Sequence, residues 1–362
     1  MKLSDYITVI NGKNQKKVES LDGEYPIYGS GGQMGRATDF ICSKNTVIIG
    51  RKGTINTPIF VDEPFWNVDT AFGLSPKHNL DAKYLYWFCK HFNFMTISTS
   101  TTIPSLTKTS IENIDVRFPS KERQVTISKE LDNLQKGLNA LKTRDLTLSE
   151  LVKSRFIEMF GDPMDEKKWN SKFTEVVIFN PKKSEVKKDM EIEASFVPME
   201  AIGTDGSFSI KKSGKIKDFY KRYTYFKDGD VIFAKITPCF ENGKIAIANH
   251  CTNKIGFGTT EFHVARPISG KANAEWVMNL LRNDSLHTYA SSKMTGSAGQ
   301  KRIQTPFFEK LGVYLPPLEL QNRFADFVHL IDKSRFIVQS QIKDLQELLD
   351  SKMDEYFGGD EE

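Results

Sequence analysis

The chain contains 362 residues, of which 39% are hydrophobic and 27% are charged. This composition is typical of a globular protein in water, and the length is sufficient for two domains. No apolar run approaches the roughly 20 residues of a membrane-spanning helix, and the first residues do not resemble a signal peptide, so we expect a cytoplasmic protein without a membrane partner.

The distribution of charge bears on whether the protein binds nucleic acid, and the cysteine content bears on whether its thiols are reduced. The net charge is +4, with a basic excess in residues 163–315 and an acidic excess in residues 316–362. A basic, non-helical region can hold a polyanion such as nucleic acid, although lysine-rich surfaces are often only solvated. The four cysteines form no CxxC pair, which suits reduced and mostly buried thiols.

Residues 1–119 are predicted to form a small β-rich domain. An apolar strand at Thr46–Ile49, a strand around Phe72 and a helix at Ala82–Cys89 are separated by polar or glycine-rich loops. The glycine-rich segment Tyr28–Gly32, with Gly35, lacks the sequence context of a P-loop or a dinucleotide-binding turn. We therefore interpret it as a flexible loop or tight turn rather than a nucleotide site.

Residues 120–162 are predicted to form a long helix. No proline interrupts the segment between Pro119 and Pro163, and Gly137 is the only glycine before Gly161. Apolar residues recur in steps of four and three, the spacing of a helix that packs along one seam. The seam residues are Ile127, Leu131, Leu134, Leu138, Leu141, Leu148 and Val152. About 40 residues in this helix would extend roughly 60 Å.

Residues 163–316 follow the same plan as the first domain. An Asn180-Pro181-Lys182 turn precedes strands at Val231–Phe233 and Lys244–Ala248, a strand around Phe262, and one short helix at Ala274–Leu281. Between these landmarks the two domains diverge strongly in sequence. We therefore predict two domains of one fold that recognise different targets.

Residues 317–358 repeat the first long helix. Residue i of the first copy corresponds to residue i + 197 of the second without a gap, which aligns Pro119 with Pro316, Glu122 with Glu319, Gln124 with Gln321, Glu158 with Glu355, Phe160 with Phe357 and Gly161 with Gly358. The second seam comprises Phe324, Val328, Ile331, Val338, Ile342, Leu345 and Leu349. Two such helices in an internally repeated chain are predicted to pack as an antiparallel pair.

A polar residue interrupts each seam. Asp145 stands in the first seam and Arg335 in the second. An antiparallel pair that crosses near both helix midpoints brings these two residues opposite each other. We therefore predict a salt bridge between them that fixes the register of the helices.

Two patterns could suggest chemistry, but the first is not on a strand and the second does not have the required spacing. Asp162, Glu166 and Lys168 loosely resemble a nuclease motif at a helix-to-domain junction, and Cys239, His250, Cys251 and His263 do not match a standard zinc finger. No Ser/His/Asp or Cys/His arrangement can be singled out. The sequence therefore predicts no catalytic residue and no metal site.

Loop residues at matched places in the two domains are predicted to contact DNA. Arg and Lys can bind guanine, Asn and Gln can bind adenine, and hydroxyls and glycine amides can hold phosphates. One loop ends an apolar strand in each domain, and another precedes each long helix; ordinary solvated loops are the alternative. The residues are Arg51, Lys52, Thr54, Thr101 and Thr102 in the first domain, and Lys235, Thr237, Asn242, Lys244, Ser297, Gln300, Lys301 and Arg302 in the second.

Over nearly its whole length the chain resembles the specificity subunit of a type I restriction–modification system. The resemblance is carried by the domain exits IENIDVRFPSKERQ and FFEKLGVYLPPLELQ, and by the helix ends RFIEMFGD and MDEYFGG. It is also carried by VIIGRKGTIN with the downstream DTAFGLSP, and by GDVIFAKITPCFENGKIAIA followed by TTEFHVARP. The repeated exit followed by a heptad helix is the most specific of these features.

The resemblance implies an α+β fold with two similar target-recognition domains, each a small, β-rich α/β domain. Two long conserved helices would join these domains and pack as an antiparallel coiled coil. The overall arrangement would be pseudo-two-fold. The implied segments are target-recognition domain 1 (1–119), spacer helix 1 (120–162), target-recognition domain 2 (163–316), spacer helix 2 (317–358) and an acidic tail (359–362). Each domain would read one half of a bipartite sequence in double-stranded DNA, and the helices would set the gap between the halves.

The resemblance also implies partners. Two methyltransferase subunits would supply S-adenosylmethionine and adenine methylation, and restriction subunits would use ATP and magnesium. The chain itself would be non-catalytic, hold no cofactor or metal, and act in the cytoplasm of a prokaryote. The first domain departs from the pattern because it lacks a lead-in like Trp169-Asn170 and has Pro119-Ser120 where the second has Pro316-Pro317. The compact domains are expected to read few bases each.

Two other functions remain open from the residues alone. A stand-alone DNA methyltransferase or nuclease with degenerate motifs would bind S-adenosylmethionine or cut DNA without help. A coiled-coil adaptor that does not bind DNA would show no salt-dependent DNA binding, even in complex with its partners.

Overall fold

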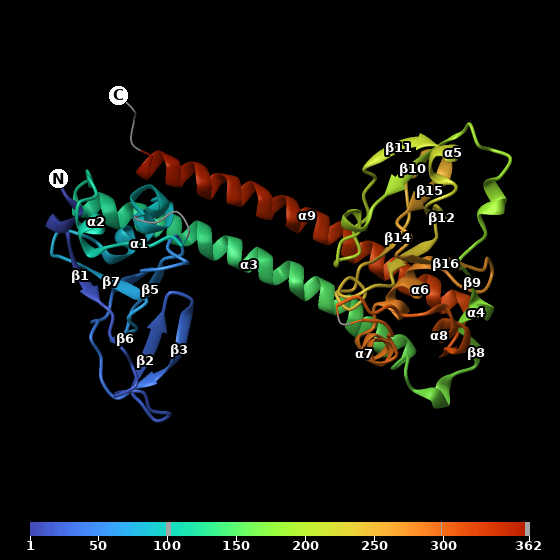
Figure 1. Ribbon diagram of the computed structural model, residues 1–362, viewed down its shortest axis with the longest axis horizontal. Helices are drawn as coiled ribbons and strands as arrows, with labels where there is room; N and C mark the ends of the chain where they lie inside the picture. Colours follow the sequence, from blue (N-terminus) through green and yellow to red (C-terminus); the bar gives the residue numbers. More distant parts are fainter. Residues whose placement is uncertain (99–102, 298, 359–362) are drawn as a thin grey trace. The chain divides into compact units, whose positions relative to one another are not determined.

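The computed structural model describes residues 1–98, 103–297 and 299–358 (Figure 1). The chain divides into two compact units: unit 1 comprises Met1–Thr143 and Gln339–Glu362, and unit 2 comprises Arg144–Val338. The boundary between the units passes through two 40-residue helices, α3 (Lys121–Phe160) and α9 (Leu318–Phe357). Each unit therefore combines a β-rich domain with one half of each long helix.

Unit 1 is built on a four-stranded antiparallel sheet with strand order β1-β7-β4-β5. Its strands are β1 (Ile7–Asn11), β4 (Thr46–Gly50), β5 (Ile59–Val61) and β7 (Ala71–Pro76). A second sheet has the order β3-β2-β6, from β2 (Tyr25–Gly29), β3 (Gly32–Ala37) and β6 (Trp66–Asn67). All five residues of β4 are buried, because its two faces are both covered.

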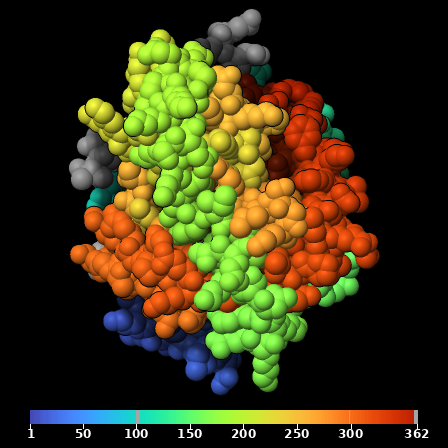
Figure 2. Space-filling view, turned by 90° about the vertical axis from the view of Figure 1, so that its right-hand side faces the viewer, coloured from blue at the N-terminus to red at the C-terminus, as the bar shows by residue number. Residues whose placement is uncertain are grey.

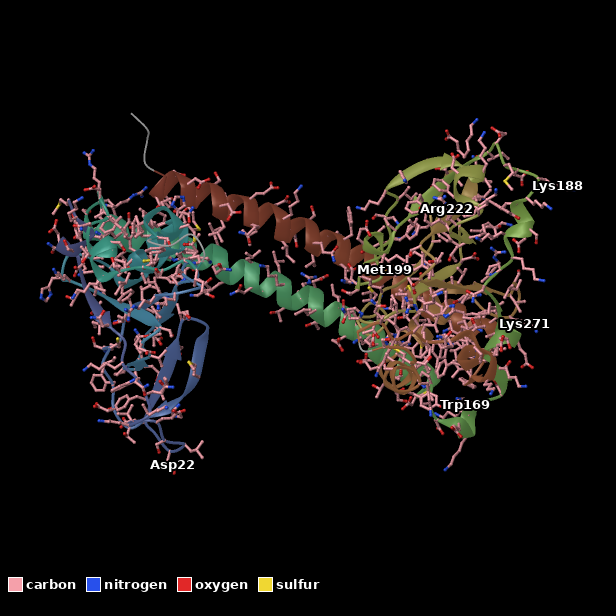
Figure 3. The ribbon with its side chains drawn as sticks, viewed as in Figure 1. Asp22, Trp169, Lys188, Met199, Arg222 and Lys271 are labelled. Carbon is pink, nitrogen blue, oxygen red and sulfur yellow. The ribbon has the colours of Figure 1, made fainter. Side chains whose placement is uncertain are left out.

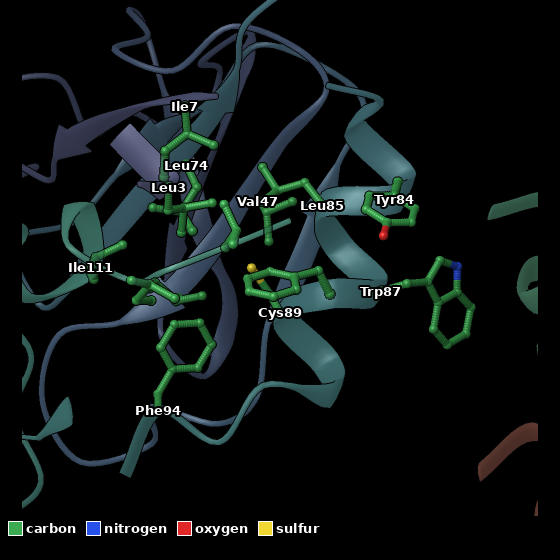
Figure 4. Close-up of a cluster of buried hydrophobic side chains, with 14 of the residues drawn as sticks. Leu3, Ile7, Val47, Leu74, Tyr84, Leu85, Trp87, Cys89, Phe94 and Ile111 are labelled. Carbon is green, nitrogen blue, oxygen red and sulfur yellow. The ribbon is translucent and has the colours of Figure 1, made fainter. Parts of the chain in front are cut away.

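Helix α1 (Ala82–His91) covers the main sheet of unit 1, and α2 (Lys108–Glu112) leads toward α3. Figure 4 shows side chains from β1, β4, β7 and α1 gathered in one core, in which Val47, Leu74, Leu85 and Cys89 are fully buried. Trp87 lies at the edge of this group, and its indole N–H donates to Asp132 on α3 over 2.9 Å. The core thus continues from the domain into the helix.

Unit 2 repeats the main sheet of unit 1. The strand order β14-β13-β16-β9 matches β5-β4-β7-β1, and all its pairs are antiparallel. The strands are β9 (Val177–Phe179), β13 (Val231–Ala234), β14 (Ile245–Ile247) and β16 (Phe262–Pro267), and α6 (Ala274–Leu281) packs on this sheet. The sequence landmarks at Val231, Phe262 and Ala274 are therefore correctly placed.

A second sheet in unit 2 has the order β11-β10-β15-β12. Its strands are β10 (Glu193–Val197), β11 (Lys212–Lys215), β12 (Thr224–Lys227) and β15 (Ile255–Gly258). The remaining elements are β8 (Ser171–Lys172), α4 (Phe173–Val176), α5 (Ile216–Phe219), α7 (Asp284–Ser292), α8 (Thr305–Lys310) and β17 (Gly312–Val313). The expectation of one short helix in this domain is wrong, because α7 follows α6 directly and begins at its own cap, Asn283.

The surface of unit 2 is built from distant parts of the chain. In the space-filling view of Figure 2, residues that follow α3 (green) lie between later segments coloured orange and red. In the interior, Phe173, Val231, Trp276 and Phe324 belong to one hydrophobic cluster. The sheet, the short helices and the adjoining half of α9 therefore form a single folded body.

A buried glutamine joins each domain to its long helix in the same way. In unit 1, Gln124 accepts a hydrogen bond from the Asp81 amide over 2.8 Å and donates to the carbonyls of Asn79 and Pro119. In unit 2, Gln321 accepts from the Asn273 amide over 3.0 Å and donates to the carbonyls of Lys271 and Pro316, both over 2.9 Å. Both glutamines are almost completely buried.

The predicted helices and seams are present in both units. In unit 1, the α3 residues Ile127, Leu131 and Leu138 share a core with Leu349 and Met353 of α9. In unit 2, the rings of Phe156 and Phe160 on α3 lie 5.5 and 5.4 Å from that of Phe324 on α9, at edge-to-face angles. In unit 1 the beginning of α3 meets the end of α9, and in unit 2 the end of α3 meets the beginning of α9, so the helix halves are antiparallel. The α+β fold class is thereby confirmed.

The predicted ion pair is also present. Arg335 donates from Nε to Oδ1 of Asp145 over 3.0 Å and from Nη2 to Oδ2 over 3.3 Å, and both side chains are mostly shielded from solvent. Its role in fixing the helix register stays a prediction.

Asp145→Ala is expected to lower the free energy of unfolding of unit 2 by about 1–2 kcal/mol, because Arg335 keeps its charge in a half-buried site. The double variant Asp145→Leu with Arg335→Leu should lose less stability than Asp145→Ala, because it does not leave the Arg335 charge without Asp145. Denaturant titration checks both variants, and equal losses in the two would contradict this explanation.

Candidate nucleic-acid interface

In unit 1, the loop that follows β4 pairs with the segment that precedes α2. The amide of Arg51 donates to the Thr70 carbonyl, and the carbonyl of Arg51 accepts from the Leu106 amide over 2.9 Å. Gly53 donates to the Pro104 carbonyl over 2.9 Å. Backbone hydrogen bonds therefore hold the Arg51–Thr54 loop beside residues Pro104–Leu106.

In unit 2, the loop that follows β13 makes the same contacts. The amide of Lys235 donates to the Glu261 carbonyl, and its carbonyl accepts from the Ile303 amide, both over 2.9 Å. Thr237 donates to the Lys301 carbonyl over 2.9 Å. Isolated bridges, Lys52 with Ser105 in unit 1 and Ile236 with Arg302 in unit 2, complete the correspondence. In unit 2 the two loops predicted from the sequence are therefore neighbours, and in unit 1 the Arg51–Thr54 loop lies beside residues Pro104–Leu106.

Several predicted DNA-binding residues have exposed side chains beside these paired backbones. In unit 1 they are Arg51, Lys52 and Thr54; Thr101 and Thr102 lie outside the described residues. In unit 2, the exposed residues are Asn242, Ser297, Gln300 and Lys301, and Lys235 is half-buried. The guanidinium carbon of Arg51 lies 5.9 Å from the centre of the Phe72 ring. Whether these residues contact DNA stays a prediction.

Three predicted residues in unit 2 have partners within the protein. Arg302 forms an ion pair with Glu261, and Thr237 donates from its hydroxyl to Glu241 over 2.8 Å. The ammonium of Lys244 donates over 3.0 Å to the carbonyl of Met199, a residue labelled in Figure 3. These polar groups support the loops from inside, which leaves fewer of their donors for a ligand.

Sequence reasoning did not include the turn between β2 and β3 among the candidate residues. A Cβ at Gly50 would lie 3.2 Å from Cβ of Ser30, and it would overlap the carbonyl oxygen of Thr54. The tip of the β2–β3 hairpin therefore borders the Arg51–Thr54 loop, and only glycine fits at position 50. The glycine-rich Tyr28–Gly32 segment is the sequence signal for this neighbour, but its interpretation as a flexible loop or tight turn does not reveal the contact.

Two titratable groups beside the unit 2 loops, Glu261 and His263, have shifted pKa values. The guanidinium of Arg302 holds the pKa of the Glu261 carboxyl below its usual value. Burial lowers the pKa of His263 to about 4. The ring accepts a hydrogen bond from the Asn180 amide at Nδ1 over 3.1 Å and donates from Nε2 to the Ile303 carbonyl over 3.0 Å, which suits a neutral imidazole. His263 thus supports the strand-like pairing of Ile303.

The described part of the chain offers no cluster of three or more His, Cys, Asp or Glu side chains suited to a metal ion. In the same residues, no helix combines the length and the apolar character that crossing a membrane requires.

Two curated relatives are specificity subunits of Escherichia coli restriction enzymes. The chain is 44% identical over 168 residues to the type I restriction enzyme EcoEI specificity subunit and 45% identical over 168 residues to the EcoAI specificity subunit. Each match covers 44% of this chain, but only 27% and 28% of the relatives. The chain therefore spans little more than a quarter of the length of the curated relatives that it matches.

Two solved structures share the fold. The S subunit of a type I restriction–modification system from M. genitalium aligns with a TM-score of 0.60 at 15% identity, over 99% of this chain and 95% of that one. A chain from a study of complex assembly and conformational transition of the type I R-M system aligns with a TM-score of 0.58 at 13% identity, over 99% and 96%.

The family model described as the type I restriction modification DNA specificity domain matches residues 1–148 and again residues 166–347. The two matches together cover most of the chain and follow its internal repeat. The chain therefore belongs to the family of type I restriction–modification DNA specificity domains.

Proposed function

We propose that this chain is a sequence-specific DNA-binding specificity subunit that reads a bipartite target. The observation that carries the proposal is the repeated pairing of a basic loop, after β4 or β13, with the segment before the shared exit. Each unit has its own version with different side chains, as two domains that read different half-sites require. Helices α3 and α9 would set the length of the unread gap.

We further propose that the chain directs catalytic partners rather than carrying out chemistry itself. The partners would be two methyltransferase subunits that bring S-adenosylmethionine and restriction subunits that use ATP and magnesium. Exposed apolar side chains on α9 support a docking role for this helix. Leu330, Phe336 and Ile337 are 62%, 75% and 58% exposed, which is unusual for three large apolar residues within eight positions.

The adenine methylation pattern of cells carrying a partner methyltransferase, with and without this chain, tests the proposal. A bipartite methylated motif that appears only with the chain is expected. Unchanged methylation sites would favour a coiled-coil adaptor without DNA binding. Binding of S-adenosylmethionine or cleavage of DNA by the purified chain alone would favour a stand-alone enzyme.

Lys52→Ala and Lys301→Ala are expected to weaken DNA binding by the assembled complex for all sequences. Each change removes one phosphate-neutralising charge, so the slope of log K against log salt should become shallower by about one unit. Binding titrations at several salt concentrations measure this slope. Lys343→Ala on α9 is the matched control, because Lys343 is 75% exposed and pairs with Glu347. Unchanged slopes would remove Lys52 and Lys301 from the DNA interface.

Phe336→Asp is expected to weaken association with the methyltransferase subunit by about tenfold or more, because it places a charge in an apolar contact. The stability of the chain itself should change by less than about 0.5 kcal/mol, since the side chain is 75% exposed. Co-purification at fixed concentrations checks the association. Leu21→Asp, at a residue that is 98% exposed in unit 1, provides the control; equal loss in both variants would argue against docking at Phe336.

A further inference from the structure

We propose that Arg302 is a positioning residue, and that its ion pair with Glu261 fixes the loop residues Gly299–Arg302 so that Gln300 and Lys301 face the DNA. This inference rests on the proposed DNA-reading function and assigns Arg302 a role different from direct base or phosphate contact. It also assigns a function to Glu261, an acidic residue within a surface expected to bind a polyanion.

The guanidinium of Arg302 is occupied on three sides. Nε donates to Oε2 of Glu261 and Nη2 donates to Oε1, both over 3.0 Å, so the two planar groups meet as a fork. Nη1 donates to the carbonyl of Gln300 over 2.9 Å. The side chains of Arg302 and Glu261 are 35% and 27% exposed. A phosphate or base would have to break this arrangement before it could use Arg302.

The loop is closed on itself by the same residue. The backbones of Thr295 and Arg302 exchange two hydrogen bonds, over 3.1 and 2.8 Å. The amide of Gln300 donates to the Ser297 carbonyl over 2.9 Å and forms a turn within the loop. Because Arg302 also holds the Gln300 carbonyl, its side chain and backbone together restrict the section that carries Gln300 and Lys301.

The carboxylate of the pair is attached to a fixed part of unit 2. Glu261 immediately precedes β16, its amide donates to the hydroxyl oxygen of Thr259 over 3.2 Å, and its carbonyl accepts from Lys235. The next residue of the loop strand, Ile303, is buried and is held by Lys235 and by the buried His263. The ion pair therefore ties the exposed loop to the end of the main sheet.

Charge supports the same assignment. Glu261 neutralises Arg302, so the loop pair in unit 2 presents Lys235 and Lys301 as its remaining cations. A direct phosphate contact would gain from a free guanidinium and would lose from a carboxylate within 3.0 Å of it. A carboxylate at this position repels phosphates, and because both of its oxygens accept from Arg302, placing the neighbouring readers is the role that this geometry supports.

Unit 1 lacks the pair at the equivalent place. The Thr70 carbonyl accepts a hydrogen bond from the Arg51 amide, just as the Glu261 carbonyl accepts one from the Lys235 amide. Ser105 forms a β-bridge with Lys52, just as Arg302 does with Ile236. Neither Thr70 nor Ser105 carries a charge. The positioning device is thus specific to unit 2, and its removal is expected to change only the half-site that unit 2 reads.

The test uses the full chain assembled with its methyltransferase, and it measures both the methylated motif in cells and DNA affinity against salt. Glu261→Gln is expected to relax the half-site of unit 2, to leave the other half-site unchanged, and to tighten non-specific binding. The slope of log K against log salt should become steeper by about one unit in this variant. This corresponds to a roughly threefold greater loss of affinity between about 50 and 200 mM salt. Arg302→Lys keeps the charge but loses the fork, so it should relax the same half-site with an unchanged slope.

Either of two results overturns the inference. One is an unchanged motif and slope in Glu261→Gln. The other is an Arg302→Lys variant that loses cognate binding while Glu261→Gln retains the wild-type motif, because that pattern marks Arg302 as a direct reader. Retention of the first half-site in both variants verifies that the chain is folded. If the wild-type assembly directs no bipartite methylation, the proposed function itself fails. This outcome can be distinguished from the two results above, because it is seen in the wild type and not only in the variants.

Discussion

Gln321→Ala should lower the free energy of unfolding of unit 2 by about 3 kcal/mol. The carboxamide of Gln321 is fully buried and makes three hydrogen bonds, one from the Asn273 amide and two to the carbonyls of Lys271 and Pro316. Alanine leaves all three backbone groups without their partner, and each such loss costs roughly 1 kcal/mol or more. Denaturant unfolding, followed by a probe in unit 2, measures the change.

The internal repeat provides a matched control. Gln124→Ala removes the corresponding contacts to Asp81, Asn79 and Pro119, so it should destabilise unit 1 by a similar amount and leave unit 2 unchanged. A loss below about 1 kcal/mol in both variants would mean that water replaces the carboxamide at these sites. Equal effects on both units from either variant would mean that the two units unfold together.

Acidification from pH 7 to pH 5 should destabilise unit 2 by about 2 kcal/mol through His263 alone. Burial lowers the pKa of this histidine to about 4, whereas an unfolded histidine titrates near 6.5. Between these values the unfolded chain binds a proton that the folded chain does not, so stability falls as pH decreases from about 6.5 and the effect is complete below about 4. Urea titrations at the two pH values measure it.

His263→Gln isolates this contribution, because glutamine keeps donor and acceptor groups but does not titrate. The difference in stability between pH 7 and pH 5 should shrink by about 2 kcal/mol in the variant. Burial also lowers the pKa of His287, so part of the pH dependence should remain. A variant with the full wild-type pH dependence would rule out His263 as its source.

The long helices and their contacts could be predicted because their pattern is local and repeated. Seam residues such as Leu131 and Leu349 recur at helical spacing, and a single polar residue in each seam indicated the pairing of Asp145 with Arg335. The positions of strands β4, β7, β13, β14 and β16 could also be predicted from short apolar runs, although their order in the sheets could not. Burial on both faces made β4 and β13 recognisable without an alternating pattern.

The features that were missed depend on contacts between distant residues. Strands β10 and β15 pair in parallel although about 60 residues separate Ser195 from Gly256, and neither has a continuous apolar run. Glu261 and Arg302 are 41 residues apart, so their ion pair could not be read from spacing, and Arg302 was expected to be available to DNA. Helix α7 is short and largely polar, and only its Asn283 cap marks it.

The division of the chain into units has a consequence for synthesis on the ribosome. Unit 2 is one continuous stretch, Arg144–Val338, whereas unit 1 needs both Met1–Thr143 and the segment that begins at Gln339. Leu349 and Met353 complete the core around Ile127 and Leu131, so the domain translated first cannot close its core until the last helix half has emerged. The second domain to be translated is therefore the first that can finish folding, and a chain that stops after residue 338 would leave the apolar seam of the first domain uncovered.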